Sequence, residues 1–266
     1  MTKQTTRSIY WFSGSGNSLY TACRLSEILG GTLHKIHTGA EGPGSGDSEL
    51  GLVFPVHSFR IPVLVKKWIE RTDLSNIREC WAVMTMGGGA YNAPDELRGL
   101  FARKGVPLLS VQTIVYPDNC IYLYNANSCR GDAVTRPILA GAEDALRNAA
   151  ANIQQKKEIF PERKNPLAGF LLSGVLGSLF LSGVEKAKKR PWTVSDKCII
   201  CGQCAAVCPS HNIVITNGKP VWGTACVLCM ACIQWCPAHA INYRSATAAR
   251  LRYHHPKADV KQLSQG

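Results

Sequence analysis

The sequence has few acidic residues, and its N-terminal stretch has no long apolar run. Each of these shortages narrows the range of functions that the protein can have. The N-terminal stretch MTKQTTRSIYWF holds an apolar run of only four residues, which is too short for the core of a signal peptide. We therefore expect a cytoplasmic protein in a reducing compartment, where its twelve cysteines act as ligands rather than as disulfides. At 266 residues the chain is long enough for one large domain or for two smaller ones.

Acidic side chains are scarce, since 18 Asp and Glu stand against 30 Lys and Arg, and the formal net charge is +12. The excess is uneven: residues 1–165 hold 19 basic and 15 acidic side chains, whereas residues 166–266 hold 11 and 3. Such a charge favours an acidic redox protein as partner, or an anionic membrane surface. Nucleic acid is not expected, because no basic and aromatic binding motif accompanies the charge.

A serine- and glycine-rich loop at 12–18, FSGSGNS, lacks the residues that two common phosphate motifs need. A nucleoside-triphosphate loop ends in Gly-Lys-Ser/Thr, which is absent here. A dinucleotide loop has a third glycine, where this chain has Leu19, and an acidic residue after the next strand, where LHKIHT offers only His37. Short polar side chains and two glycines before a helix instead favour the phosphate of flavin mononucleotide (FMN). The predicted contacts in this serine loop are Ser13, Gly14, Ser15, Gly16, Asn17 and Ser18.

Apolar runs alternate with amphipathic stretches over the first 160 residues. Strands are predicted at 7–12, 51–56, 80–85 and 108–115, with LHKIHT as a further strand after the first helix. Helices are predicted at 18–29, 62–71, 94–104 and 135–158. This alternation predicts an α/β fold with a doubly wound parallel sheet, whose ligands bind at the carboxyl ends of the strands.

Eight of the twelve cysteines form a duplicated pattern, three cysteines two residues apart followed by Cys-Pro, which begins at Cys198 and again 28 residues later at Cys226. Such a triplet can hold one face of a 4Fe–4S cluster, and in two-cluster bacterial ferredoxins the fourth cysteine binds the other cluster. The predicted ligands are Cys198, Cys201, Cys204 and Cys236 for cluster one, and Cys226, Cys229, Cys232 and Cys208 for cluster two. Zinc also binds CxxC pairs, but it gains nothing from the triple spacing or the exchanged fourth ligand. Aliphatic residues between the ligands are expected to keep water from the sulfurs.

An uncharged stretch at 167–184, LAGFLLSGVLGSLFLSGV, precedes the cysteines and is flanked by basic residues on both sides. Its length of 18 residues approaches the roughly 20 that a membrane span needs, but it contains four glycines and three serines. Three alternatives stay open: a helix packed on two domains, a helix at a membrane surface, and a true span. Internal packing is the preferred interpretation.

The serine loop, the cysteine repeat and the sequence RYHHP at 252–256 occur in one order along the chain. In this respect the chain resembles the flavodoxin–ferredoxin fusion family of anaerobic bacteria, over about residues 7–120 and 191–256. The resemblance implies a flavodoxin-like FMN-binding domain at 1–165, an apolar and basic linker at 166–190, a small α+β ferredoxin domain with two 4Fe–4S clusters at 191–245, and a basic C-terminal tail at 246–266.

The resemblance also implies two more loops in contact with the flavin and a third that closes the pocket. The implied contacts are Pro55, Val56, His57, Ser58 and Phe59 in the first loop, Met86, Gly87, Gly88, Gly89 and Tyr91 in the second, and Asn119 in the third. Two residues depart from the family pattern, because Cys120 stands where an aromatic is expected and basic Arg60 lies in a flavin loop. Cys23, Cys80, Cys120 and Cys129 are assigned no chemistry, and no side chain is assigned a catalytic role.

Three functional hypotheses follow from these motifs. The preferred one is an electron-transfer protein that passes electrons between two 4Fe–4S clusters and FMN. The alternative is an FMN-dependent reductase of a quinone-like or other oxidised small molecule, fed by the clusters. The third is a membrane-associated subunit that docks through residues 167–184.

Overall fold

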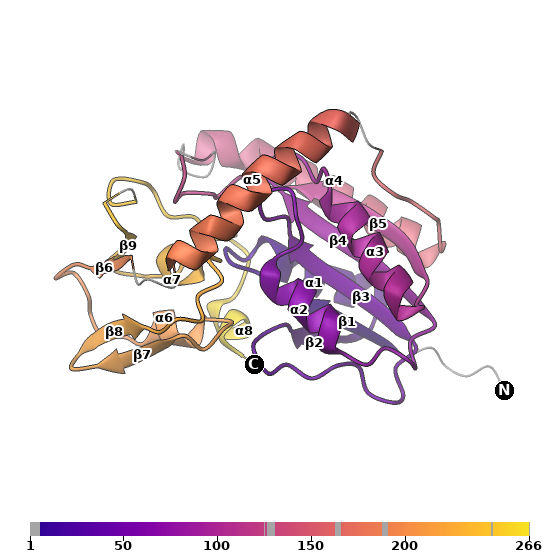
Figure 1. Cartoon of the computed structure of the whole chain (residues 1–266), viewed down its shortest axis with the longest axis horizontal. Helices are drawn as coiled ribbons and strands as arrows, with labels where there is room; N and C mark the ends of the chain where they lie inside the picture. Colours follow the sequence, from indigo (N-terminus) through magenta and orange to yellow (C-terminus); the bar gives the residue numbers. More distant parts are fainter. Residues whose placement is uncertain are drawn as a thin grey trace.

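The computed structural model describes residues 6–124, 126, 131–162, 166–187, 191–245 and 247–265, without the side chains of residues 166–173. Cys129 and the basic flanks of the apolar stretch, at 163–164 and 188–190, lie outside the described residues. Figure 1 shows two halves side by side: an N-terminal half built on a sheet, and a smaller C-terminal half. One long helix lies across both.

The N-terminal half is organised by a single parallel sheet. Its strands are β1 (Arg7–Trp11), β2 (Thr32–Lys35), β3 (Glu49–Pro55), β4 (Glu79–Met86) and β5 (Leu108–Val115). They pair in the order β2-β1-β3-β4-β5, which is the order of flavodoxin-like folds. The predicted α/β fold with a doubly wound sheet is therefore confirmed. The strand order reverses next to β1, so a ligand of this sheet is expected beside the serine loop.

Helices cover both faces of the sheet. They are α1 (Asn17–Leu29), α2 (Val63–Arg71), α3 (Ala93–Lys104) and α4 (Asp132–Gln154). Neighbouring strand residues point to opposite faces: Tyr10 belongs to the core that contains α2 and α3, and Trp11 to the core that contains α1 and α4. Helix α4 begins three residues before its predicted start, at Asp132, because an acidic side chain in the first turn favours a helix N-terminus.

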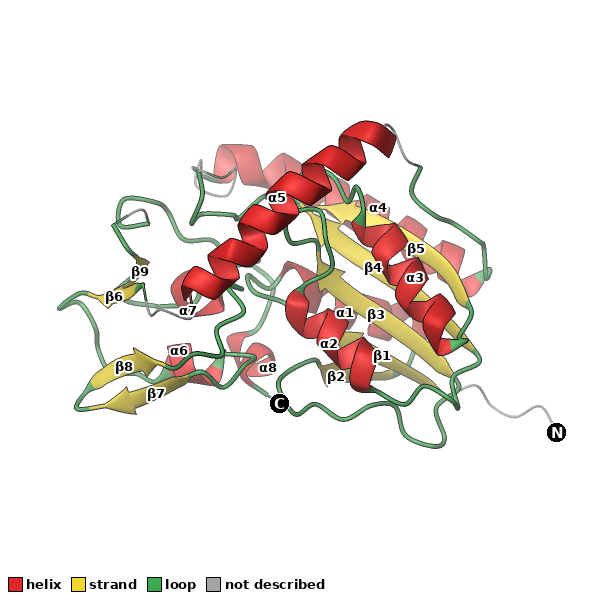
Figure 2. Ribbon diagram, in the orientation of Figure 1, coloured by secondary structure: helices red, strands yellow, loops and turns green. Residues whose placement is uncertain are grey.

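The C-terminal half consists of short elements around a core that contains most of the repeated cysteines. Two antiparallel pairs, β6 (Trp192–Val194) with β9 (Ile241–Tyr243) and β7 (Ile213–Thr216) with β8 (Lys219–Trp222), flank the one-turn helices α6 (Gln203–Ala206) and α7 (Ala231–Gln234). The strands of the sheet point toward this half in Figure 2. The last helix, α8 (Val260–Ser264), returns to the N-terminal half and buries Leu263 in its core.

The apolar stretch forms helix α5 (Pro166–Ala187), which lies across both halves. Its buried Phe180 and Val184 belong to the core of the C-terminal half. On the N-terminal side, Gly177 lies so close to Arg60 that a Cβ there would stand 2.8 Å from the arginine side chain. No helix within the described ranges is long and apolar enough to cross a membrane.

Candidate redox site at the junction of the two halves

The predicted flavin loops meet at the carboxyl edge of the sheet. The serine loop follows β1, and the other three follow β3, β4 and β5. Ser18 and Thr85 share a hydrogen bond of 2.8 Å between hydroxyl oxygens, and the Asn119 amide donates to the Ser15 hydroxyl. In the second loop, a Cβ on Gly87 would stand 2.4 Å from Asp118, so this loop and the third are in contact. The fold thus brings together residues that the sequence places more than a hundred positions apart.

The serine loop has the features of a phosphate site. Gly16 adopts a φ of 93°, a conformation that favours glycine. It is the N-cap residue of α1, and no side chain caps the start of this helix. The first amides of α1 therefore have no side-chain acceptor, and the helix dipole adds partial positive charge there. Ser13 accepts a hydrogen bond of 3.0 Å from the Gly16 amide, which leaves its hydroxyl proton available to an anion. These donors fit the phosphate of FMN.

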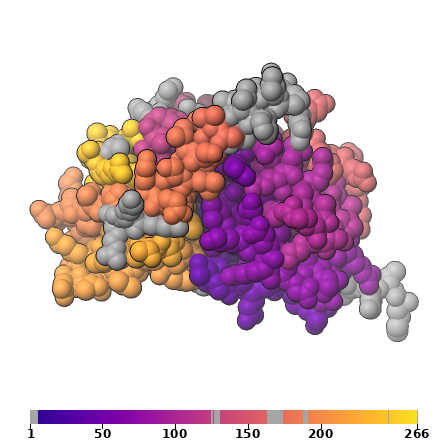
Figure 3. Space-filling view, in the orientation of Figure 1, coloured from indigo at the N-terminus to yellow at the C-terminus, as the bar shows by residue number. Residues whose placement is uncertain are grey.

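The same loop is also the docking surface of the C-terminal half. The Trp235 indole donates to the Gly14 carbonyl at 2.9 Å, and the His255 amide donates to the Ser15 carbonyl at 2.8 Å. A Cβ on Gly14 would stand 2.2 Å from the Cys229 carbonyl oxygen. The Tyr253 hydroxyl lies 2.8 Å from the Asn17 side-chain oxygen, to which it donates. Figure 3 shows the two halves in contact along this boundary. Gly14 is thus required by the junction as well as by the loop.

The loops that would hold the flavin ring are in contact with each other. Ser58 and Phe59, with φ of 47° and 66°, form a tight turn that His57 and Arg60 close through two backbone hydrogen bonds of 3.0 Å. The Phe59 ring packs edge-on against Tyr91, with 4.5 Å between ring centroids. A ring stacked between these two aromatic side chains would have to separate them. The ring end of the proposed site is therefore closed by this aromatic pair.

His57, in the first flavin loop, is enclosed by aromatic side chains. Its imidazole packs edge-on against Phe12 and against Phe180 of α5. Burial lowers the pKa of His57 from 6.5 to about 4, and its Nδ1 atom has no hydrogen-bond partner. A neutral imidazole with one unsatisfied polar atom suits a position beside a polar ligand atom.

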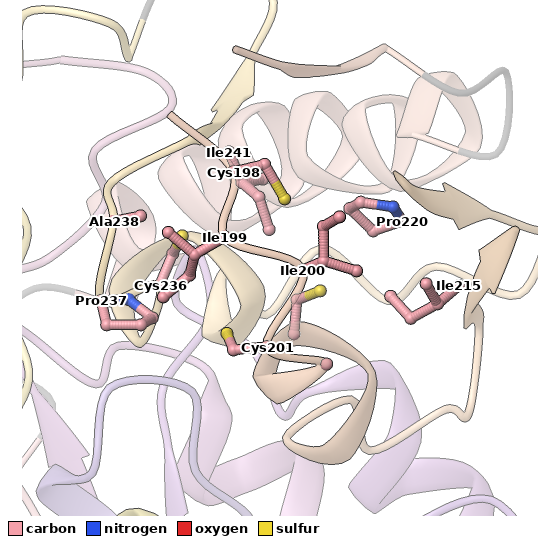
Figure 4. A pocket seen from close by; sticks show the side chains of 12 residues that line it. Cys198, Ile199, Ile200, Cys201, Ile215, Pro220, Cys236, Pro237, Ala238 and Ile241 are labelled. Atoms are coloured by element: carbon pink, nitrogen blue, oxygen red, sulfur yellow. The ribbon is translucent and has the colours of Figure 1, made fainter. Parts of the chain in front are cut away.

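The four predicted ligands of cluster one line one small cavity. Figure 4 shows Cys198, Cys201 and Cys236 around it, and Cys204 completes the lining. The remaining lining residues are Ile199, Ile200, Gly202, Ile215, Pro220, Pro237, Ala238 and Ile241. Cys201 is exposed, and Ile199 and Ile200 are 65% and 55% exposed. Cluster one would therefore lie at the surface inside an apolar rim.

The four predicted ligands of cluster two also lie close together, but Cys208, Cys226 and Cys232 are buried and Cys229 is half-buried. Burial raises the pKa of Cys232 well above its ordinary value, and the neighbouring thiols of Cys229, Cys226 and Cys208 raise it further. Cys208 likewise raises the pKa values of Cys226 and Cys229, so its thiol lies near the second triplet. Among the described residues, no group of three His, Cys, Asp or Glu is arranged to hold a single metal ion.

The backbone repeats with the cysteines. Ile200 and Leu228, which stand at equivalent positions of the two triplets, have φ of 58° and 56°. The Asn212 amide donates to the Cys208 sulfur at 3.4 Å, and the equivalent Ala240 amide donates to the Cys236 sulfur at 3.3 Å. Amides that point at cysteine sulfurs are typical of protein 4Fe–4S sites. Both sites therefore have the same backbone around their sulfurs.

Three side chains around cluster two were not expected from the sequence. Lys35, at the end of β2, is buried with its amino group unpartnered, and burial lowers its pKa while the Cys229 and Cys208 thiols raise it. The indole N–H groups of Trp192 and Trp222 are also buried, with only cysteine sulfurs as partners. They lie against Cys226 and Cys232, and hydrogen bonding to these sulfurs lowers the pKa values of the two thiols. Nothing in the pattern LHKIHT marks its lysine as a neighbour of cysteines that lie over 170 positions away.

Comparisons with known proteins agree with part of this assignment. The 4Fe-4S binding domain family matches residues 191–214, which include the first triplet and Cys208. No curated protein matches the chain.

Among solved structures, the chain is similar to a flavoprotein in complex with FMN from Lactobacillus acidophilus (14% identity, TM-score 0.33, 41% of this chain and 93% of that one). It is also similar to an NAD(P)H:quinone oxidoreductase from Methanothermobacter marburgensis (13% identity, TM-score 0.36, 57% and 98%). A Trp repressor binding protein from Bacillus subtilis shows a comparable similarity (13% identity, TM-score 0.37, 55% and 96%). The fold assignment itself follows from the strand order.

Proposed function

Because the chain joins a flavodoxin-like domain to a 4Fe–4S domain, as its resemblance implied, we propose that it is an electron-transfer protein with two clusters and FMN. The observation that carries the proposal is the contact between Cys229 and Gly14. Cys229 is a predicted ligand of cluster two, and Gly14 lies in the proposed phosphate loop. This contact would set an iron–sulfur centre directly against a flavin site.

The proposed path runs from the surface to the junction. Cluster one, held by Cys198, Cys201, Cys204 and Cys236, would exchange electrons with a partner at its exposed rim. Cluster two, held by Cys208, Cys226, Cys229 and Cys232, would stand between cluster one and the serine loop. When bound, FMN supplies an acceptor for one or two electrons. The chain's own part is to hold the phosphate on the α1 amides and to exclude water from cluster two.

An acidic redox protein is the proposed partner. The net charge of +8 over residues 166–266 attracts an acidic surface. The exposed side chains of Ile199 and Ile200 offer an apolar contact beside cluster one. Because surface charges are screened by salt, transfer to such a partner should slow as ionic strength rises.

The test is a cofactor count on anaerobically purified protein. We expect about eight irons, matching sulfide and about one FMN per chain, with stepwise bleaching of clusters and flavin on reduction. A Ser13→Ala, Ser15→Ala double variant should lose FMN and keep its iron, whereas Ser75→Ala, an exposed change outside the flavin loops, should keep both. Eight irons without flavin, even after reconstitution, would contradict the flavin part of the proposal.

A second candidate function is reduction of a small molecule, and one cavity favours it. A hollow of about 480 Å³ lies beside Cys236 and next to the stacked rings of Trp235 and His254. Its position beside a cluster ligand would let a substrate accept electrons there. Turnover of quinones or nitro compounds with a chemical reductant, lost when the hollow is filled by Ala258→Trp, would support this function. Complete inertness toward such substrates would contradict it.

Membrane docking through α5 is the third proposal. Val175 and Leu179 are each 61% exposed on this helix, while its buried side faces the two halves. Sedimentation with anionic vesicles that is lost in Val175→Ser, Leu179→Ser would support it. Protein that stays in the supernatant at low salt would contradict it.

A further inference from the structure

Three buried N–H groups lie at the cysteines of cluster two, and apart from the cysteine sulfurs none of them has a hydrogen-bond partner. Two are the indoles of Trp192 and Trp222, whose rings stack with 5.5 Å between centroids. The third is the amino group of Lys35, which comes from the sheet of the N-terminal half. Buried donors in proteins almost always have a partner, and a buried ammonium without one is costly. Three such donors at one place indicate that an acceptor belongs between them.

The acceptor that fits is the cluster itself. A 4Fe–4S core with four thiolate ligands carries a net charge of about −2 when oxidised and about −3 when reduced by one electron. Cluster sulfurs accept hydrogen bonds from N–H groups, and a nearby cation favours the more negative state. The segment that follows β2 lies against the segment that holds Cys208, since the Thr38 amide donates to the Pro209 carbonyl at 2.8 Å, and the thiols of Cys229 and Cys208 raise the pKa of Lys35. The orphaned donors therefore match the charge and chemistry of the predicted group.

Cluster one has different surroundings, although its backbone is the same. Apart from its four cysteines, its cavity is lined entirely by Ile, Gly, Pro and Ala residues. These side chains offer neither a cation nor a hydrogen-bond donor. The two sites thus share their backbone amides and differ in side-chain donors and charge.

We propose that Lys35, with Trp192 and Trp222, raises the reduction potential of cluster two above that of cluster one. The inference rests on the proposed two-cluster function. One electron moves from reduced cluster one to oxidised cluster two, so that the first is oxidised, the second is reduced, and no proton is transferred. The electron would then reside on the cluster whose predicted ligand Cys229 contacts the serine loop. The N-terminal half, through Lys35, takes part in setting the redox properties of a centre bound by the C-terminal half.

The experiment is an anaerobic redox titration of the full chain with dithionite, followed by electron paramagnetic resonance. A Cys201→Ala variant, which removes cluster one, identifies the signal of cluster two. At the potential where wild-type cluster two is half reduced, Lys35→Met should lower its ratio of reduced to oxidised form by about tenfold, which is about 59 mV for one electron. Lys35→Arg keeps the charge and should titrate close to wild type.

The controls separate this inference from the proposed function. Lys67→Met removes an exposed lysine of α2 and should leave both signals unchanged. Trp222→Phe keeps an aromatic ring, though a smaller one, and removes the N–H. It should shift cluster two in the same direction by a smaller amount, even where Lys35→Met does not fold. Iron well below eight per chain would overturn the two-cluster function. Full iron with unshifted titrations in both Lys35→Met and Trp222→Phe would overturn the inference alone.

Discussion

Two copies of one cysteine motif stand in opposite environments. Leu228 in the second copy is 2% exposed, whereas its equivalent in the first copy, Ile200, is 55% exposed. Both residues adopt the same left-handed backbone conformation. The second copy is covered by the serine loop, β2 and α5, while the first faces solvent through its isoleucine rim. The local motif therefore determines the backbone around each site, and the docking of the two halves determines burial, charge and access.

Under the proposed function, this difference would give the two sites different tasks. A centre near the surface would exchange electrons with a partner, because transfer requires a short distance to the outside. A centre in the junction would be protected from water and would lie against the proposed flavin site. A ferredoxin with two equally exposed clusters would lack this division. Changes made in matched pairs, one in each copy, can test it.

The largest expected effect is the loss of a cluster. Cys198→Ala and Cys226→Ala should each lower bound iron from about eight to about four per chain. Only Cys226→Ala should also expose the junction to protease, because Cys229 then loses the cluster that holds it against Gly14. Iron analysis and limited proteolysis measure the two effects. Cys23→Ala, in α1, should leave the iron unchanged, and full iron in both ligand variants would show that these cysteines are not ligands.

Shortening one side chain in each copy of the motif should lower the free energy of unfolding by different amounts in the two copies. Leu228→Ala removes a buried side chain and should lower the free energy of unfolding by about 2–5 kcal/mol. Ile200→Ala removes an exposed side chain and should change it by less than about 0.5 kcal/mol. Urea unfolding of anaerobic protein provides the comparison. Equal losses in the two variants would contradict the difference in burial.

The contact between Gly14 and Cys229 can be broken directly. In Gly14→Ala the added methyl group meets a backbone carbonyl, so we expect a loss of about 1–3 kcal/mol and easier proteolysis at the junction. Gly46→Ala is the matched control, since a Cβ there has nothing within 4 Å. Wild-type stability in Gly14→Ala would mean that the two halves are not in backbone contact at this point.

The sequence predicts those features that depend on short segments. The alternation of strands and helices is enough to predict the sheet. The cysteine spacing predicts two sets of four ligands, because a triplet can wrap a cluster locally, and these ligand sets stay a prediction. The loops predicted to hold the flavin lie at one edge of the sheet because parallel strands end together.

Contacts of the junction could not be predicted in this way. In the sequence, Lys35 looks like an ordinary strand residue and Trp235 like an ordinary residue at a helix end. Only the packing of one half on the other places Lys35 beside the predicted ligands of cluster two and Trp235 beside the serine loop. The sequence RYHHP contributed to the family resemblance, but its place in the fold could not be predicted from the sequence. In the structure it lies against the serine loop, where the Tyr253 hydroxyl and the His255 amide donate hydrogen bonds. Such roles depend on residues more than 170 positions apart, for which a single sequence holds no local signal.

Lowering the pH should decrease the free energy of unfolding, because histidines buried near the junction must become protonated. The pKa of His57 falls from 6.5 to about 4 on folding, so between these values the unfolded chain binds more protons and stability is lost as pH decreases. From pH 6.5 to 5.5 the expected loss is about 1 kcal/mol. His255, whose pKa burial also lowers to about 4, should add a similar amount. Urea midpoints measured across this range should lose about half of their pH dependence in His57→Phe, whose ring keeps the contact with Phe180. An unchanged slope in that variant would mean that His57 is accessible to protons in the folded protein.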